Sequence, residues 1–183
     1  HFAEKSPGLQ RARGIGRVTT QQSAERTRLQ TLFQERCCKI RLPNAHSPAL
    51  EAALINTAGG ITGGDRLEWG AQVEANGHLV ITTQACERSY RSTGDTARGT
   101  TRLHVGENAH LDWLPQETIL FGASRLDRHL EADLEAGATL TAIEAVLLGR
   151  EAMGESARDA MLTDRWTVRR RGRLVHAEAT RLS

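Results

Sequence analysis

The chain has 183 residues, enough for one domain with a substantial core, and its formal net charge of +2 favours no polyanionic partner. Aromatic residues make up only 4% of it, which argues against a protein that binds single-stranded nucleic acid by base stacking. No apolar run approaches the roughly 18 residues of a membrane span, and no signal-peptide pattern opens the sequence. We therefore expect a cytoplasmic protein that binds neither membrane nor nucleic acid.

The secondary structure of residues 21–33, the first segment with a periodic pattern, is ambiguous. It carries leucines and a phenylalanine at helix-like spacing, but the β-branched Thr27 and Thr31 weaken a helix. Helix and strand both remain open for this segment.

A glycine-rich loop follows at residues 56–67, between two stretches that are typical of strands. Glycine permits positive φ angles and close approach of neighbouring backbone, so the loop predicts a tight structural turn. A phosphate-binding loop is the alternative, but no Gly-Lys-Ser/Thr ends the motif and no clear helix follows it. The residues assigned to the structural turn are Gly59, Gly60, Gly63 and Gly64.

Three later segments repeat one pattern of strand, small-residue turn and strand. Their aliphatic anchors Val73, Val105 and Leu134 recur with a period of about 30 residues, which is typical of stacked supersecondary units. Alternating apolar and polar residues make each unit a strand pair. We predict an all-β fold, a helix-like β-solenoid stack of strand pairs in which each unit buries its apolar face on the next.

The last part of the chain predicts a corner and a hairpin. Residues 144–153 are rich in helix formers but interrupted by Gly149, which favours a short helix or an irregular corner. Residues 166–168 and 174–175, joined by Arg-Arg-Gly, predict a further β-hairpin. The fold is therefore expected to contain at most one or two short helices.

Conventional catalytic and metal motifs are missing from the sequence. No serine lies in a Gly-x-Ser-x-Gly elbow, no histidine pair forms HExxH, and the three cysteines lack the spacing of a disulfide framework or a zinc site. His104 and His110 could approach each other across a turn, although exposed strand histidines are the simpler interpretation.

The carboxylates are more informative. Glu87, Glu117 and Glu144 follow core leucines at even-numbered offsets, so unbroken strands would place all three on the inner face. A carboxylate there requires a counter-charge or water. One interpretation is a set of ion pairs with arginines, and the other is a water-filled passage that holds a hard or borderline cation briefly. The arginines available for such pairs are Arg88, Arg91 and Arg150.

Four segments in the same order, residues 56–67, 82–92, 113–121 and 148–155, resemble the urease accessory protein D family, called H in some bacteria. The resemblance implies an all-β, helix-like fold without catalysis of its own. It also implies a scaffold and conduit that works with accessory protein F and the GTPase accessory protein G to deliver nickel to the urease apoprotein. No cofactor would be tightly bound, and nickel would be in transit. By this analogy the residues lining the nickel passage are Asp65, Glu87, Glu117 and Glu144.

The resemblance is incomplete in two places. Residues 121–125 read Phe-Gly-Ala-Ser-Arg where the family has Phe-Asp-Gly-x-Arg, so an acidic position is absent. We expect residues 1–183 to form a single β domain that lacks the family's C-terminal part. A second hypothesis remains: a β-solenoid enzyme that acts on a sugar or polyanionic substrate with paired carboxylates as acid and base.

Overall fold

A computed structural model describes residues 11–43, 46–149 and 157–183, and within these ranges the chain forms strands and loops without a helix. The all-β prediction is confirmed. The strands are β1 (Arg13–Ser23), β2 (Arg26–Arg36), β3 (Cys38–Arg41), β4 (Leu50–Asn56), β5 (Arg66–Val73), β6 (His78–Thr83), β7 (Glu87–Ser89), β8 (Ala97–Val105), β9 (His110–Leu114), β10 (Thr118–Leu120), β11 (Arg125–Leu134), β12 (Thr139–Ala142), β13 (Val146–Leu148), β14 (Met161–Arg170) and β15 (Arg173–Leu182).

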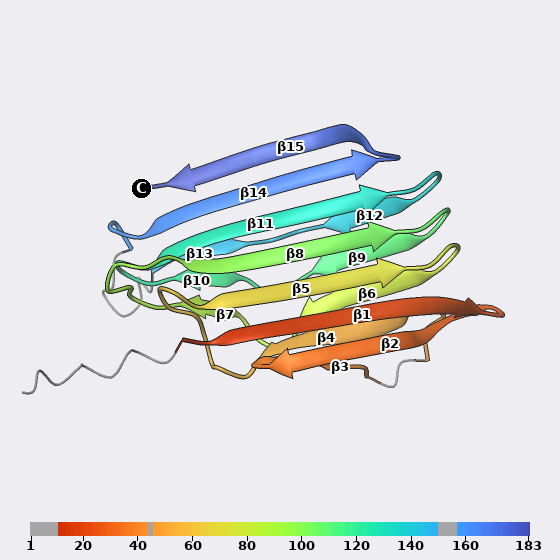
Figure 1. The fold of residues 1–183 in the computed structure, drawn as a ribbon, viewed down its shortest axis with the longest axis horizontal. Helices are drawn as coiled ribbons and strands as arrows, with labels where there is room; N and C mark the ends of the chain where they lie inside the picture. The colour runs from red at the N-terminus through yellow and green to blue at the C-terminus, as the bar shows by residue number, and fades with distance from the viewer. Residues whose placement is uncertain (1–10, 44–45, 150–156) are drawn as a thin grey trace, which may run out of the picture.

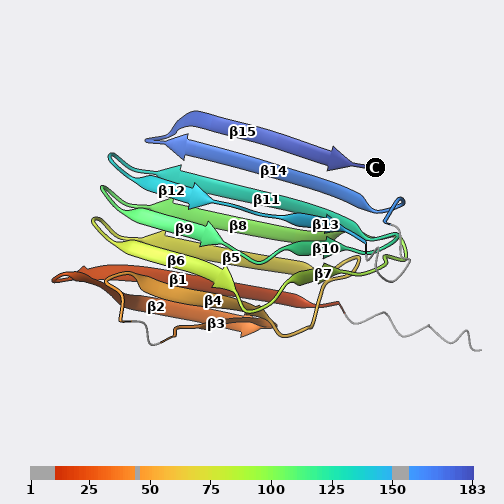
Figure 2. The same ribbon diagram turned by 180° about the vertical axis from the view of Figure 1, so that it is seen from behind.

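The strands stack as a solenoid with two layers (Figure 1). One layer is a seven-stranded sheet in the order β15-β14-β11-β8-β5-β1-β2. The other layer consists of a five-stranded sheet, β12-β9-β6-β4-β3, and a three-stranded sheet, β13-β10-β7, which lie end to end (Figure 2). Each coil runs along a long strand, turns, and returns along two short ones.

The repeat predicted from the sequence is the repeat of this solenoid. The aliphatic anchors are direct partners in the parallel ladder, because Val73 pairs with Val105 and Val105 pairs with Leu134. Their side chains are buried, as are Leu79 and Leu111 on the facing sheet. Stacking of equivalent positions therefore forms the larger of two apolar clusters between the layers, which is how a repeat protein stabilises units that could not fold alone.

Antiparallel hairpins add to both ends of the parallel stack. The segment left open between helix and strand, 21–33, is part of the β1–β2 hairpin, which turns at Ala24 with a φ of 53°. The predicted C-terminal hairpin is β14–β15, and Arg171 and Gly172 at its turn both have positive φ, as a two-residue hairpin loop requires. The preference for a strand over a helix at 21–33 arises from pairing with β1, which overrides local propensity.

The segment expected to be a short helix or corner, 144–153, is an extended corner as far as the structure describes it. Residues 146–148 form β13, which pairs in parallel with β10, and Gly149 follows with a φ of 69°. Residues 150–153, including Arg150, lie outside the described residues. Across the described part of the chain, no helix offers the length and apolar character needed to cross a membrane.

Candidate functional site

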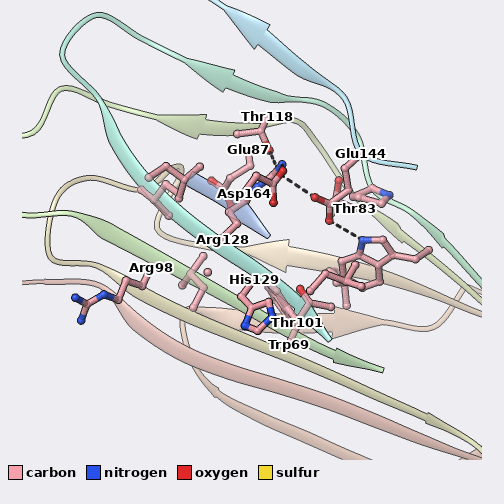
Figure 3. A pocket seen from close by; sticks show the side chains of 18 of the residues that line it. Trp69, Thr83, Glu87, Arg98, Thr101, Thr118, Arg128, His129, Glu144 and Asp164 are labelled. Carbon is pink, nitrogen blue, oxygen red and sulfur yellow. Dashed lines mark hydrogen bonds and ion pairs between the residues drawn. The ribbon is translucent and has the colours of Figure 1, made fainter. Parts of the chain in front are cut away.

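A pocket of about 100 Å³ lies between the layers, where two apolar clusters of the core meet. Leu54 and Trp113 line it from one cluster, and Leu67 and Leu126 line it from the other. A volume this size exceeds the roughly 10–15 Å³ that one water molecule needs, so the pocket can hold several waters or a hydrated ion. Figure 3 shows much of its polar lining, which comprises Thr83, Glu87, Arg98, Thr101, Gln116, Thr118, Arg128, His129, Glu144 and Asp164.

A largely buried arginine organises one wall of this pocket. Arg128 on β11 contacts Asp164, its register partner on β14, through Nη2, and its Nη1 lies 3.1 Å from Glu144 Oε2. The other carboxylate oxygen of Glu144 accepts a hydrogen bond of 2.7 Å from Trp113 Nε1. The three charged side chains are only 15%, 11% and 14% exposed for Arg128, Glu144 and Asp164. One guanidinium thus neutralises part of the charge of two buried carboxylates.

The pairing in this wall is incomplete. Arg128 Nε and Asp164 Oδ1 are buried atoms that have no hydrogen-bond partner within the described ranges of the chain. Buried polar atoms are almost always paired with protein or ordered water. A lining carboxylate oxygen with open lone pairs can therefore accept a donor, or approach a cation, inside the pocket.

Glu87, the first residue of β7, contributes a further carboxylate to the polar lining. Asn56 Nδ2 donates to both of its carboxylate oxygens at 3.2 Å, and the Arg88 backbone N–H donates to Oε1 at 3.2 Å. Burial nevertheless raises the pKa of Glu87 above its ordinary value, helped by the negative charge of Asp65 and opposed by these hydrogen bonds. Among the described residues, no cationic partner offsets the desolvation of this carboxylate.

We expect Glu87 to make stability depend on pH. A carboxyl whose folded pKa is raised destabilises the fold when ionised, so stability should fall as the pH rises from the unfolded value of 4.5 through the raised folded pKa, and then level off. Glu87→Gln keeps an oxygen that accepts from Asn56 and removes the charge. Guanidinium unfolding from pH 4 upwards should show that the stability of the parent chain declines relative to that of Glu87→Gln as the pH rises. Glu117→Gln, which should retain the decline, is the control, and equal profiles for all three proteins would contradict the assignment.

Of the four carboxylates predicted to line a passage, the structure brings Glu87 and Glu144 to the pocket and leaves Asp65 and Glu117 outside its lining. Asp65 is 4% exposed and accepts hydrogen bonds from the backbone N–H groups of Ala12 at 2.7 Å and Thr62 at 2.8 Å, so it holds the glycine loop closed. Glu117 lies half-buried in the corner between β9 and β10.

The prediction for Glu117 assumed strands that continue unbroken from the core leucines, and they do not. β6 ends at Thr83 and β7 begins at Glu87, while β9 ends at Leu114 and β10 begins at Thr118. A corner between two strands resets the alternation of faces, so an even offset no longer fixes the side. Thr83, the last residue of β6, lines the pocket, whereas Arg88, one of the expected ion-pair partners, is an exposed residue.

Sequence reasoning missed the ion-pair partners. The expected arginines were Arg88, Arg91 and Arg150, but the partner of Glu144 is Arg128, and the second carboxylate is Asp164. Both residues lie on strands whose polar positions look like ordinary exposed faces in the sequence. The one available signal was the closeness of Arg128 to the predicted third repeat, and it did not distinguish Arg128 from its arginine neighbours.

The glycine loop has the geometry of a packed turn. Gly59, Gly60 and Gly64 have φ angles of 77°, 145° and 89°. Several of its backbone N–H groups are already engaged: Ile61 donates to the Arg88 carbonyl at 2.8 Å, and Thr62 donates to Asp65. Amides that donate within the protein are not available to cradle a phosphate, so the geometry favours the structural interpretation over the nucleotide-binding one.

The comparisons with known proteins show the family to which the chain belongs. A family model described as UreD urease accessory protein matches residues 12–183. The chain is 64% identical over 175 residues to a urease accessory protein UreD of Chelativorans sp. (strain BNC1), covering 96% of this chain and 63% of that protein. It is 54% identical over 176 residues to one of Agrobacterium fabrum, covering 96% of this chain and 62% of the relative. The chain thus spans under two thirds of these relatives, and it belongs to the UreD family of urease accessory proteins.

Proposed function

We propose that this protein is a scaffold and conduit in urease maturation, through which nickel passes on its way to the urease apoprotein. The observation that carries the proposal is the internal pocket where Glu87, Glu144 and Asp164 converge between the layers. Family membership supports the connection with urease, and the pocket supports passage of a cation.

The ligand chemistry of the pocket suits transfer better than storage. Its oxygen ligands come from carboxylates that are already partly neutralised by Arg128 or hydrogen-bonded by Asn56. An ion held by a few such oxygens, with water completing its shell, is attracted without being trapped. Conduction requires this balance, because an ion that binds too tightly does not leave. Nickel is accordingly proposed as cargo in transit and not as a resident cofactor.

The proposed partners are accessory protein F, the GTPase accessory protein G within the same complex, and the urease apoprotein, all meeting in the cytoplasm. We propose these partners because of the family to which the chain belongs. We propose no catalytic turnover for this protein.

The alternative of a carbohydrate-active enzyme is less well supported by the same pocket. Small-molecule sites usually measure about 300–1,000 Å³, and the pocket here is about 100 Å³. Two of its carboxylates, Glu144 and Asp164, share the guanidinium of Arg128, so neither is free to act as an acid or a nucleophile. These facts favour a passage for an ion over a substrate site.

Glu87→Gln is expected to lower the nickel content of urease severalfold without preventing complex assembly. The substitution removes a negative charge from the pocket and retains the hydrogen bond from Asn56. Nickel per urease active site would be measured after maturation with the parent or variant protein, and assembly by co-purification with accessory protein F.

Glu117→Gln is the matched control, because Glu117 lies outside the pocket lining, and it should mature urease as the parent does. Full nickel loading with Glu87→Gln would reject the pocket as the passage. Failure of the parent protein to co-purify with accessory protein F would reject the proposed complex.

A further inference from the structure

Outside the pocket, two histidines and an aspartate gather on the outer face of the five-stranded sheet. His78 on β6 is the register partner of His110 on β9, and Asp112 lies two residues further along β9 on the same face. Their neighbours Leu79 and Leu111 are fully buried, so the three polar side chains point away from the core. Figure 2 shows β6, β9 and β12 side by side on this face.

The three side chains converge on one another. His78 Nε2 lies 2.8 Å from Asp112 Oδ2, and His110 Nε2 lies 2.9 Å from Asp112 Oδ1. The two rings meet edge to face with centroids 4.7 Å apart. One ligand atom from each residue falls within 4.8 Å of the others. Ligands bound at about 2.0–2.1 Å in a tetrahedral site are roughly 3.3 Å apart, so small side-chain rotations bring these atoms into a first coordination shell.

We infer that His78, His110 and Asp112 form a binding site for one divalent transition-metal ion of the nickel and zinc class. Imidazole nitrogen and carboxylate oxygen are ligands that such ions accept. Three protein ligands leave at least one coordination position open to water or to a donor from another molecule, as in exchangeable sites. The proposal stands on this cluster and does not depend on the proposed passage of nickel through the pocket.

Neighbouring side chains already orient the ligands. His110 Nδ1 contacts the hydroxyl of Thr139, its register partner on β12. A hydroxyl can accept as well as donate, so when the metal takes Nε2, the proton on Nδ1 can be donated to Thr139. A second hydrogen bond of this kind fixes the ring of a metal-bound histidine and is part of most protein metal sites.

The site is accessible to an ion from solvent. The side chains of His78 and His110 are 42% and 33% exposed, and that of Asp112 is 18% exposed. His176 and Glu178 on β15 provide an internal comparison: they also place a histidine beside a carboxylate, with 3.6 Å between Nε2 and Oε2, but lack the second histidine. If metal binding requires two histidines and a carboxylate, the cluster of His78, His110 and Asp112 should bind a metal ion measurably and the pair on β15 should not.

Isothermal titration of the untagged full chain with NiCl2, and separately with ZnCl2, tests the inference. We expect one ion to bind at this cluster. His110→Ala and His78→Ala should each lower the affinity for that ion by a factor on the order of ten to a hundred or more. His176→Ala should leave the affinity unchanged, and thermal unfolding should show that each variant remains folded. Thr139→Val should weaken binding by about tenfold if its hydroxyl orients His110.

Direct observation of the rings separates this site from the pocket. Paramagnetic Ni²⁺ should broaden the imidazole NMR signals of His78 and His110 at substoichiometric concentration, and equally so in Glu87→Gln. Unchanged titrations for His78→Ala and His110→Ala, or broadening of other histidines alone, would overturn the site. Full nickel delivery to urease by Glu87→Gln, with an intact His78–His110 response, would instead count only against the proposed passage.

Discussion

Replacing Arg128 by methionine is expected to lower the free energy of unfolding by about 3–5 kcal/mol, because it leaves the buried Glu144 and Asp164 without their shared counter-charge. The arginine is 15% exposed, and it also donates to Thr118 Oγ1 at 3.1 Å. Methionine fills much of the same volume, so the loss in the free energy of unfolding reflects the removed charge more than lost packing. Guanidinium unfolding followed by tryptophan fluorescence measures the change.

A surface pair on the same two strands serves as the control. Arg165 Nη2 lies 2.7 Å from Asp127 Oδ1, but the two side chains are 47% and 29% exposed. Arg165→Met should lower the free energy of unfolding by no more than about 1 kcal/mol, as is usual for exposed ion pairs. Similar losses for Arg128→Met and Arg165→Met would show that burial does not decide the outcome.

Removing the carboxylate charges tests the cause further. Combining Arg128→Met with Glu144→Gln and Asp164→Asn should recover part of the stability, because no uncompensated charge then remains in this wall of the pocket. A triple variant that is less stable than Arg128→Met alone would contradict this explanation and would indicate that the hydrogen-bond geometry dominates.

Gly60→Val is the second substitution with a large expected effect, a loss of about 3 kcal/mol or more. Gly60 has a φ of 145°, which a β-branched residue strongly disfavours. A Cβ there would overlap the ring of Tyr90 and lie 2.8 Å from the Arg88 carbonyl oxygen, which accepts the hydrogen bond from Ile61. Soluble yield and guanidinium unfolding would measure the loss.

Alanine substitutions at two other glycines separate the effect of steric overlap from the effect of an unfavourable φ angle. A Cβ at Gly99 would meet only Arg128 Cγ at an ordinary 3.7 Å, so Gly99→Ala should be nearly neutral. A Cβ at Gly63 would press on Ser92 Oγ and the Asp95 carbonyl, so Gly63→Ala should cost about 1–3 kcal/mol without a positive φ. If Gly60→Val and Gly63→Ala proved stable and impaired only nucleotide binding, the phosphate-binding interpretation would be correct.

The predictions that depend on local pattern agree with the structure. Alternation along 73–84, 105–116 and 134–144 predicted strand pairs, and the common period predicted their stacking. Both follow from the sequence because each coil of a solenoid contacts its neighbour at equivalent positions, so the repeat of apolar residues records the register. Segment 21–33, which the sequence left open between helix and strand, was settled by the pairing of β1 with β2.

The predictions for individual side chains depended on assumptions that the sequence could not check. Glu117 was expected to face inwards because the strand was assumed to continue past Pro115, and the break between β9 and β10 removes that argument. Glu144 lines the pocket, although β12 ends before it, and its partner Arg128 was not identified, since the distance between them depends on how coils of unequal length stack.

The sequence by itself determined the all-β class, the solenoid repeat and the family resemblance, because these reside in short-range alternation, turn residues and local motifs. Only the tertiary structure decided which carboxylates share a pocket and that Arg128 links two of them. It also decided that the histidine close to His110 is His78, with Asp112 beside both. His104, which the sequence offered as the neighbour of His110, lies on β8 in the other layer. The physical reason is that such contacts form across strands distant in sequence, where corner geometry and the stacking of whole coils set the distance between side chains.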